Sequence, residues 1–518
     1  MSERHHAAVS SPHSLATEAG RASLAAGGTA MDAAVATNAM LSVAYPHMCG
    51  VGGDMFMLYF EASTGSVHCL NATGPAPALA TPEFYREQGL ESVPTRGPGS
   101  VTVPGTVAGW SAALDRFGAH GLAAALERPA QVAESGVAVS AGVARWIEKT
   151  APEIVEGTPL HAILKPRGVW LREGDTLRNP DLSRTLRSIA ADAGASFYRG
   201  DLAAAIGASI AAEGGPLRAE DLDAYAPEWV EPLSSWIDGH ELFVPPPNSQ
   251  GVTALLMLEK FRRLAGNAAD PRDAQYFERF ISAKRQSFEF RDRYLGDPLF
   301  HPDTLAFVDA ALAGEVPQTP ALAMTDYPPQ GDTVGLVTRD EQGNACAVIQ
   351  SIYYGFGSLF MPADTGVLLH NRGHYFSLEP GRINSLEPGK RTMHTLMCLL
   401  ALRDGVPRFV LSSMGADGQP QFIFQVLQNL LRGDTPQDAI SAPRMLDGRF
   451  SLEDDPDTVQ LEPMPEDVAD RLRSAGHSVQ VLSELSEIMG HAQAISIAAD
   501  GSVEAGFDPR SDGSAARV

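Results

Sequence analysis

The chain has 518 residues, of which 44% are hydrophobic and 20% are charged, and this ordinary globular composition excludes long disordered or fibrous regions. Its formal net charge is -24 at pH 7, and it has no lysine- or arginine-rich run, so it lacks the clustered cations that nucleic acid or an anionic membrane would require. No apolar stretch reaches the roughly 20 residues of a membrane span and the amino terminus lacks a signal-peptide core, so we expect a cytoplasmic protein.

The amino-terminal part of the sequence predicts two packed helices followed by a strand. Residues 14–26 form a helical pattern, a glycine pair ends it, and residues 30–42 continue as an alanine-rich apolar helix. Three glycines within residues 50–53 then precede a strand-like run at residues 55–60. Because glycine lacks a side chain, this cluster permits a close approach between two backbone segments.

Two loops rich in Gly and Pro are predicted to lead into helices. One is RGPGSVTVPGTVAGW at residues 96–110, and the other is PPPNSQG at residues 245–251. The region between these loops is mainly helical and charged. Residues 313–331, AGEVPQTPALAMTDYPPQG, are rich in Pro and small residues and predict an exposed linker that a processing reaction could reach.

A β-hairpin is predicted directly after this linker. Residues 333–338 and residues 345–352 are apolar and rich in β-branched side chains, and the turn RDEQGN joins them. A sheet is therefore expected to begin at Thr333.

The cysteines and histidines do not form a metal-binding pattern. The cysteines lack CxxC spacing, which argues against a zinc site and a disulfide framework and favours buried thiols. The histidines are too scattered for a motif such as HExxH, so the alternative of a metal-dependent hydrolase is disfavoured, and we expect no metal and no cofactor. The residues concerned are Cys49, Cys69, Cys346 and Cys398, and His5, His6, His47, His370, His374 and His394.

Several sequence blocks resemble those of the γ-glutamyltransferase family, in the same order. They are AAGGTAMDAAVATNAML, PHMCGVGGDMF, VPGTVAGW, PPPNSQG, GDTVGLVTRDEQGNACAV, GVLLHN, PGKR, APRM and DPR, and the resemblance covers residues 14–512. It implies a four-layer αββα sandwich of the N-terminal-nucleophile hydrolase type, an α/β (α+β) fold. It also implies a precursor that cuts itself between Asp332 and Thr333. The products would be a large subunit (residues 1–332) and a small subunit (residues 333–518) that stay together, and such heterodimers could pair into a dimer.

A threonine at a new amino terminus suits acyl transfer. Its hydroxyl can attack an amide carbonyl while its own α-amino group, with an ordinary pKa of roughly 8, accepts the proton. In the precursor this amine is part of a peptide bond, so the active site forms only on cleavage. Taken alone, Thr333 would be interpreted as a strand residue, since threonine is common in strands. The flanking family blocks instead indicate that it is the nucleophile.

Two further parts of the catalytic site follow from the resemblance. Ser351 falls where the family has a hydroxyl that hydrogen-bonds the amine of the nucleophile, and the alternative is a strand serine that faces solvent. In LSSMGADGQPQ, Gly415 and Ala416 match the paired glycines whose backbone N–H groups form an oxyanion hole, with alanine in place of the second glycine. The alternative for this turn is an ordinary strand-to-helix connection.

The positions that bind substrate depart from the family pattern. Thr73 stands where the family has the arginine that grips a substrate α-carboxylate, and a neutral hydroxyl cannot replace a bidentate charged clamp. Arg372 and Tyr375 replace a glutamine and the aspartate that binds the substrate α-ammonium group. The remaining departures are Tyr353 in place of an asparagine and His394-Thr395 in place of a serine pair.

Because of these departures, the sequence does not define the substrate. Because the catalytic residues are retained, the sequence predicts cleavage of a γ-glutamyl-type amide through an acyl-enzyme on Thr333. The pattern also resembles the divergent branch of γ-glutamyltransferase-like proteins and oxamate amidohydrolases, in which Arg372 could hold a small carboxylate. The alternative role of Arg372 is a surface or structural ion pair. A third hypothesis, an inactive binding homologue, is disfavoured by the joint presence of Thr333, Ser351 and the Gly415 turn.

Overall fold

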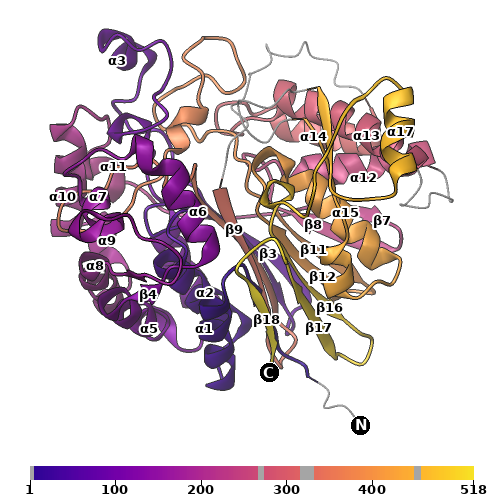
Figure 1. The fold of residues 1–518 in the computed structure, drawn as a ribbon, viewed down its shortest axis with the longest axis horizontal. Coiled ribbons are helices and arrows are strands. Elements are labelled where there is room, and N and C mark those ends of the chain that lie inside the picture. Colours follow the sequence, from indigo (N-terminus) through magenta and orange to yellow (C-terminus); the bar gives the residue numbers. More distant parts are fainter. Residues whose placement is uncertain (1–4, 266–273, 316–331, 449–456) are drawn as a thin grey trace.

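The computed structural model describes residues 5–265, 274–315, 332–448 and 457–518. Two sheets lie face to face in the middle of Figure 1, with one group of helices at the left of the sheets and a second group at the right. The order of layers is therefore helix, sheet, sheet, helix, and the predicted αββα sandwich is confirmed.

The first sheet contains seven strands among the described residues, and all its neighbouring strands are antiparallel. In spatial order they are β18 (Ser514–Arg517), β1 (Ala8–Ser11), β9 (Asp332–Arg339), β10 (Ala345–Tyr353), β2 (Asp54–Glu61), β3 (Ser66–Ala72) and β6 (Glu228–Val230). The hairpin β9–β10 thus lies between β1 and β2, which come from the amino-terminal part of the chain.

The second sheet has six strands in the described part of the chain, again antiparallel. Its order is β17 (Val503–Phe507), β16 (Ala492–Ile497), β12 (Val406–Ser413), β11 (Cys398–Arg403), β8 (His240–Val244) and β7 (Leu233–Ile237). The small sheets are β13 (Met445–Asp447), β14 (Thr458–Leu461) and β15 (Ser478–Val481), and the pair β4 (Val137–Ala138) and β5 (Thr176–Leu177).

The helices divide into two groups (Figure 1). At the left of the sheets are α1 (Ser14–Ala25), α2 (Ala30–Ala44), α3 (Pro82–Glu87), α4 (Thr106–Phe117), α5 (Gly121–Ser135), α6 (Ala141–Thr150), α7 (Pro159–Leu164), α8 (Pro180–Ala191), α9 (Ala195–Tyr198), α10 (Asp201–Ala212) and α11 (Ala219–Asp223). At the right are α12 (Gly251–Ala265), α13 (Ala274–Tyr294), α14 (Thr304–Ala313), α15 (Gln419–Leu431), α16 (Pro436–Ser441) and α17 (Glu466–Ser474).

Three apolar cores hold the four layers together. Between the first sheet and its helices, the alanine-rich α2 is buried along its whole length. Between the two sheets, a second core includes Phe56, Ile349 and Val410. The second sheet packs on α12, α13 and α15 through a third core. Each large apolar side chain that is fully buried stabilises the fold by roughly 1.5–3 kcal/mol relative to an exposed one.

The start of α2 is fixed by two carboxylates. Thr29 and Asp32 form a capping box, in which the Asp32 N–H donates to Thr29 Oγ1 and the Thr29 N–H donates to Asp32 Oδ2. Asp340, in the turn between β9 and β10, accepts a hydrogen bond from the Ala30 N–H at 2.9 Å. The turn of the central hairpin is therefore tied to the helix that covers it.

The elements predicted from the sequence agree with the structure. The helices expected at residues 14–26 and 30–42 are α1 and α2, and the strands expected at residues 55–60, 333–338 and 345–352 are β2, β9 and β10. All four cysteines are buried free thiols, as expected. The linker expected at residues 313–331 lies outside the described residues from position 316 onward.

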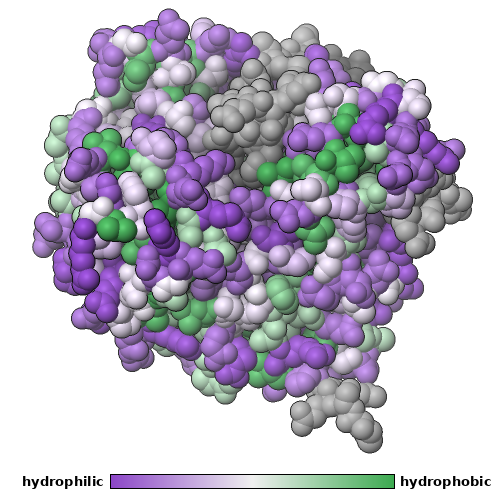
Figure 2. Space-filling model, in the orientation of Figure 1, coloured by the Kyte–Doolittle hydropathy of each residue, from purple (hydrophilic) through white to green (hydrophobic). Residues whose placement is uncertain are grey.

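The face of the molecule drawn in Figure 2 is mostly polar. On the face drawn in Figure 2, hydrophilic residues predominate and hydrophobic residues form small separate groups, which is consistent with the net charge of -24. None of the helices in the described part of the chain combines the length and the apolar character that crossing a membrane requires.

Candidate active site

Three polar side chains form a row across the centre of the first sheet. In the antiparallel register Thr333 of β9 pairs with Ser351 of β10, and Ser351 pairs in turn with Asp54 of β2. Side chains alternate between the two faces of a strand, and Val337 and Ile349, which share parity with Thr333 and Ser351, belong to the core between the sheets. The row therefore faces the second sheet and not the helices.

The hydroxyl of Ser351 contacts both Thr333 and the peptide bond between Asp332 and Thr333. The Thr333 hydroxyl donates to Ser351 Oγ at 3.2 Å, and the Ser351 hydroxyl donates to the carbonyl oxygen of Asp332 at 2.5 Å. The Tyr353 N–H also donates to Ser351 Oγ, at 2.8 Å, and fixes the position of this oxygen. All of these groups are buried. The serine thus contacts both the hydroxyl and the carbonyl that a self-cleavage reaction would join.

The predicted glycine cluster lets another segment approach Ser351 closely. A Cβ atom added to Gly53 would lie 2.3 Å from the Ser351 carbonyl oxygen, and one added to Gly52 would lie 2.3 Å from the Leu368 carbonyl oxygen. Both distances are shorter than any real contact of a Cβ atom, so only glycine fits there without a backbone shift. The close approach inferred from the sequence therefore occurs beside the candidate site.

The turn after β12 lies at the level of Thr333. A Cβ atom added to Gly335 would lie 2.6 Å from Ser412 Oγ, so β9 and β12 touch there across the interface between the sheets. Val337 and Val410 also share the core between the sheets. Lower residue numbers on β9 therefore lie beside higher residue numbers on β12, so the residues after Ser413 lie toward Thr333. Gly415 and Ala416 have φ values of 145° and 48°, so the alanine adopts the left-handed conformation that usually favours glycine.

A buried glutamine supports this turn from behind. Gln250 Nε2 donates to the carbonyl oxygens of Thr395 at 2.7 Å and Ala416 at 3.2 Å. Its own oxygen accepts a hydrogen bond from Arg291 Nη1 at 2.9 Å, and Arg291 also pairs with Asp417 at 3.2 Å. The predicted loop at residues 245–251 therefore joins the segment around Thr395 to the turn at Ala416.

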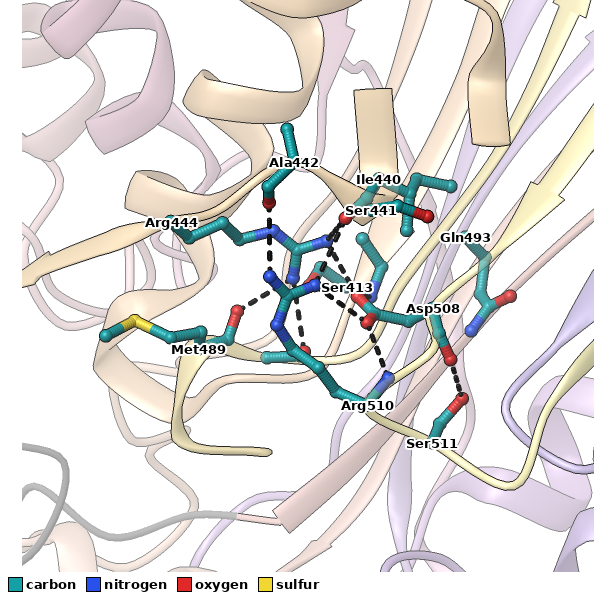
Figure 3. Close-up of polar contacts among 12 residues, drawn as sticks. Ser413, Ile440, Ser441, Ala442, Arg444, Met489, Gln493, Asp508, Arg510 and Ser511 are labelled. Atoms are coloured by element: carbon teal, nitrogen blue, oxygen red, sulfur yellow. Dashed lines mark hydrogen bonds and ion pairs between the residues drawn. The ribbon is translucent and has the colours of Figure 1, made fainter. Parts of the chain in front are cut away.

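A buried ionic cluster, drawn in Figure 3, anchors residues 489–492. Arg444 Nη2 lies 2.7 Å from Asp508 Oδ2, and Arg510 Nη1 lies 3.0 Å from Asp508 Oδ1. Arg510 also pairs with Glu462. Burial alone would raise the pKa of Asp508, but the guanidinium groups of Arg444 and Arg510 hold it below its ordinary value.

This cluster fixes the chain that packs against Met414. Arg444 donates to the Met489 carbonyl oxygen at 2.8 Å, and Asp508 accepts from the Ala492 N–H at 2.7 Å. Between these two anchors, the His491 carbonyl oxygen accepts a hydrogen bond from the Met414 N–H at 3.2 Å. The ionic cluster is therefore linked through a short backbone segment to the turn at residues 415–416.

Asp508→Ala is expected to destabilise the protein by about 3–5 kcal/mol, because it leaves buried guanidinium groups without their shared carboxylate. Thermal or urea unfolding measures the effect. The matched control is Arg187→Ala, which breaks an exposed pair with Glu134 and should cost less than about 1 kcal/mol. Equal effects of the two substitutions would contradict a structural role for the cluster.

Arg372 lies in a 3₁₀ turn (Arg372–Tyr375) and contacts Tyr353 and Thr395. Its guanidinium carbon lies 4.0 Å from the ring centre of Tyr353 and 5.5 Å from that of Tyr375. Nη2 donates to Thr395 Oγ1 at 3.5 Å, whereas Nη1 has no hydrogen-bond partner among the described residues. Only 1% of the residue is exposed, so the expected alternative of a surface ion pair does not apply. Burial lowers the pKa of Arg372, yet arginine stays protonated in proteins.

Two histidines converge on Asp54, although they are far apart in the sequence. His394 Nε2 lies 3.3 Å and His370 Nδ1 lies 3.2 Å from Asp54 Oδ2. Burial alone would raise the pKa of Asp54, but His370 and His394 hold it well below its ordinary value. Burial, reinforced by Arg372, lowers the pKa of His394 to about 3. Among the described residues no group of three or more His, Cys, Asp or Glu side chains could hold a metal ion.

Thr73 is engaged in a separate network of side chains. Its hydroxyl donates to Asn71 Oδ1 at 2.7 Å and accepts from Asn248 Nδ2 at 3.3 Å. Tyr375 is likewise engaged, since its hydroxyl donates to Asp417 Oδ1 at 3.2 Å. Both residues that replace the charged groups of the family clamp therefore already have hydrogen-bond partners within the protein.

The structure brings most of the predicted site residues into one region. Thr333 and Ser351 are hydrogen-bonded at the interface between the sheets, and β12 touches β9 there just before the turn at residues 415–416. Arg372 contacts Tyr353 and Thr395. Sequence reasoning missed the supporting groups Asp54, Gln250, Arg291, Asp417 and Glu462. A signal existed for three of them, because Asp54 lies in PHMCGVGGDMF, Gln250 lies in PPPNSQG and Asp417 lies in LSSMGADGQPQ.

Comparison with known proteins agrees with this geometry. The profile of the Gamma-glutamyltranspeptidase family matches residues 16–518. The chain belongs to this family. It is similar to the Glutathione hydrolase-like YwrD proenzyme of Bacillus subtilis, with 36% identity over 517 residues that cover 98% of each protein. It is also similar to the oxamate amidohydrolase proenzyme of Klebsiella pneumoniae, with 37% identity over 529 residues that cover 99% of this chain and 98% of that one.

The γ-glutamyltranspeptidase-family fold extends over the whole chain. A crystal structure of the cephalosporin acylase from Bacillus halodurans superposes with a TM-score of 0.89 at 34% identity and covers 99% of this chain and 96% of that one. The chain is therefore an N-terminal-nucleophile hydrolase proenzyme of the γ-glutamyltranspeptidase family with a mixed α/β fold. These relatives are named for glutathione, oxamate and cephalosporin substrates, so family membership alone does not define the substrate.

Proposed function

We propose that the chain cuts itself at Thr333 and then hydrolyses a small amide whose carboxylate is held by Arg372. Oxamate, which the Klebsiella pneumoniae relative is named for, is the simplest such compound. The observation that carries this proposal is Arg372 itself, a buried cation over the ring of Tyr353 with an unpartnered Nη1 and without a carboxylate partner among the described residues. A buried cation is costly unless an anion pairs with it.

Self-cleavage would use the contacts of the precursor. The Thr333 oxygen attacks the Asp332 carbonyl carbon, the peptide nitrogen leaves as the new α-amine, and an ester joins the two residues. Water then hydrolyses this ester, which releases the Asp332 carboxylate and restores the Thr333 hydroxyl. Ser351 is suited to polarise the Asp332 carbonyl, because its hydroxyl already donates to that oxygen.

Turnover would repeat this chemistry on the substrate. The Thr333 α-amine takes the proton of the Thr333 hydroxyl, and the oxygen attacks the amide carbonyl carbon. The backbone N–H groups of Gly415 and Ala416 stabilise the oxyanion, and the amine returns the proton to the departing ammonia. Water hydrolyses the acyl-enzyme in a second step of the same kind. No metal or cofactor enters the proposal.

A free α-amino acid head group is less favoured as substrate. Thr73 and Tyr375 occupy the positions of the charged clamp, and both hydroxyls are already bonded inside the protein. The two carboxylates described near the site are already engaged, since Arg291 and Tyr375 contact Asp417 and His394 contacts Asp54. γ-Glutamyl compounds should therefore bind weakly.

A substrate comparison tests the proposed function. Processed protein is assayed with oxamate, a γ-glutamyl anilide, glutathione and an acyl-cephalosporin under identical conditions. We expect kcat/KM for oxamate to exceed that for the γ-glutamyl compounds. Efficient cleavage of the γ-glutamyl anilide with no release of ammonia from oxamate would refute the proposed substrate class. It would not contradict the role of Thr333 as nucleophile.

Ser351→Ala is expected to slow self-cleavage and turnover by about 5- to 150-fold each, the effect of leaving one buried partner without its hydrogen bond. A time course on denaturing gels measures the processing. Ser412→Ala is a suitable control, because this hydroxyl donates to the Val348 carbonyl oxygen, away from the bond to be cut. Normal processing of Ser351→Ala would show that the serine has no part in the reaction.

The products of cleavage are proposed to remain assembled. Residues 333–518 would supply β9 and β10, and residues 1–332 would supply β1 and β2 on either side of them. A dimer of such heterodimers and a cytoplasmic location remain predictions from the sequence. Gel filtration of the processed protein tests the first of these.

A further inference from the structure

We infer that Asp54 orients the His394 ring so that an unprotonated ring nitrogen is presented beside Arg372. This nitrogen would select substrates in which an amide group with an N–H is bonded to the carboxylate. The inference rests on the proposed function and specifies which feature of the substrate His394 recognises. His394 is the specificity-determining residue, and Asp54 acts through it.

The contacts of His394 define which of its nitrogens carries the proton. Nε2 lies 3.3 Å from Asp54 Oδ2, and an ionised carboxylate can only accept a hydrogen bond. In the neutral ring the proton therefore resides on Nε2, and Nδ1 keeps its lone pair. Nδ1 is buried and has no hydrogen-bond partner among the described residues.

The carboxylate of Asp54 is itself fixed from several sides. The Gly74 N–H donates to Asp54 Oδ1 at 3.1 Å, and His370 Nδ1 packs 3.2 Å from Oδ2 without a hydrogen bond to it. His370 Nε2 in turn lies 2.9 Å from the Thr102 carbonyl oxygen. Because Asp54 cannot rotate away without losing these contacts, it holds the His394 ring in one orientation.

The backbone of His394 is held just as firmly. Its N–H donates to the Asn248 carbonyl oxygen at 2.7 Å, and its carbonyl oxygen accepts from the Gln250 N–H at 2.9 Å. The next residue, Thr395, accepts the hydrogen bond from Arg372 Nη2. An unpartnered donor, Arg372 Nη1, and an unpartnered acceptor, His394 Nδ1, thus belong to residues that are linked through Thr395.

This donor and this acceptor match two neighbouring groups on a ligand. A carboxylate can accept from Arg372, and a hydrogen on the adjacent amide nitrogen can donate to His394 Nδ1. A ligand of the same shape without that hydrogen leaves Nδ1 unpaired in a buried site, which is the strongest basis for discrimination between isosteres. Primary amides next to a carboxylate fit, whereas α-keto acids satisfy only Arg372.

Oxamate and pyruvate test this recognition, because pyruvate has a methyl group where oxamate has its amino group. The measurements are kcat/KM for oxamate and the inhibition constant of pyruvate. In processed His394→Phe we expect kcat/KM for oxamate to fall about 5- to 150-fold, while the inhibition constant of pyruvate changes by less than about threefold. His394→Asn, whose side-chain oxygen can replace Nδ1 as acceptor, should recover part of the loss.

Two further variants separate recognition from packing. Asp54→Asn can donate to Nε2 and so move the ring proton to Nδ1, and it should weaken oxamate turnover more than pyruvate binding. The matched control is Phe56→Leu, since Phe56 contacts the His394 ring edge-on with centroids 5.8 Å apart and offers no hydrogen bond. We expect this control to affect oxamate and pyruvate equally.

The outcomes distinguish the inference from the proposed function. Parallel losses for oxamate and pyruvate in His394→Phe, or no loss for either, would overturn the recognition role and leave oxamate hydrolysis standing. A processed wild type that neither hydrolyses oxamate nor is inhibited by pyruvate would overturn the proposed function and the inference together.

Discussion

Thr333→Ala is expected to give a single chain of 518 residues with turnover reduced on the order of 10⁴-fold or more. The same oxygen would attack the Asp332 carbonyl in processing and the amide carbonyl in catalysis, so both reactions should stop together. A denaturing gel should show two bands for the wild type and one for the variant. Edman sequencing of the smaller wild-type fragment should begin Thr-Val-Gly-Leu.

Two controls show whether the effect belongs to the Thr333 hydroxyl. Thr333→Ser keeps a hydroxyl and should still cleave, though more slowly. Thr338→Ala removes a different buried hydroxyl of β9, one that donates to the Ala30 carbonyl oxygen, and should cleave at the normal rate. Normal cleavage of Thr333→Ala would place the nucleophile elsewhere.

Arg372→Ala should lower kcat/KM for oxamate by roughly 10- to 150-fold, mostly through KM, because it removes a charge-assisted hydrogen bond worth about 1.5–3 kcal/mol. Self-cleavage should remain intact, since the attack on Asp332 requires no bound carboxylate. Steady-state kinetics and a denaturing gel on the same preparation measure both effects.

The controls for Arg372 separate its charge from its shape. Arg372→Lys keeps the charge but loses the planar fork, so KM should lie between the values for the wild type and Arg372→Ala. Arg408→Ala removes an arginine that donates to the Ile497 carbonyl oxygen at the far end of β12, and it should leave KM unchanged. If KM for oxamate is the same in Arg372→Ala and the wild type, the carboxylate binds elsewhere.

The pairing of Thr333 with Ser351 could be predicted from the sequence because it is local. Two β-branched runs joined by a short turn fix their own register, and the residues at positions 333 and 351 then face each other. The order of the four layers could be predicted from the family resemblance, because the matching blocks extend along nearly the whole chain.

The surroundings of Arg372 could not be predicted in the same way. The stretch between β10 and β11 is mostly irregular, so no periodic pattern indicates where His370, Arg372 and His394 point. Arginine is rarely fully buried, and sequence reasoning therefore treated a surface ion pair as a serious alternative. The contacts of Gln250 and Arg291 with the turn after β12 join parts of the chain that lie far apart in the sequence.

The place of β9 and β10 between β1 and β2 has a consequence for the cut protein. Before cleavage, denatured protein can refold as one chain, and the rate does not depend on concentration. After cleavage, the middle of the first sheet must be inserted by a separate polypeptide, so refolding becomes a bimolecular reaction in which both partners expose apolar strand edges. The mature enzyme would then stay folded because it unfolds slowly, and not because it can refold. The rate of unfolding would set its lifetime.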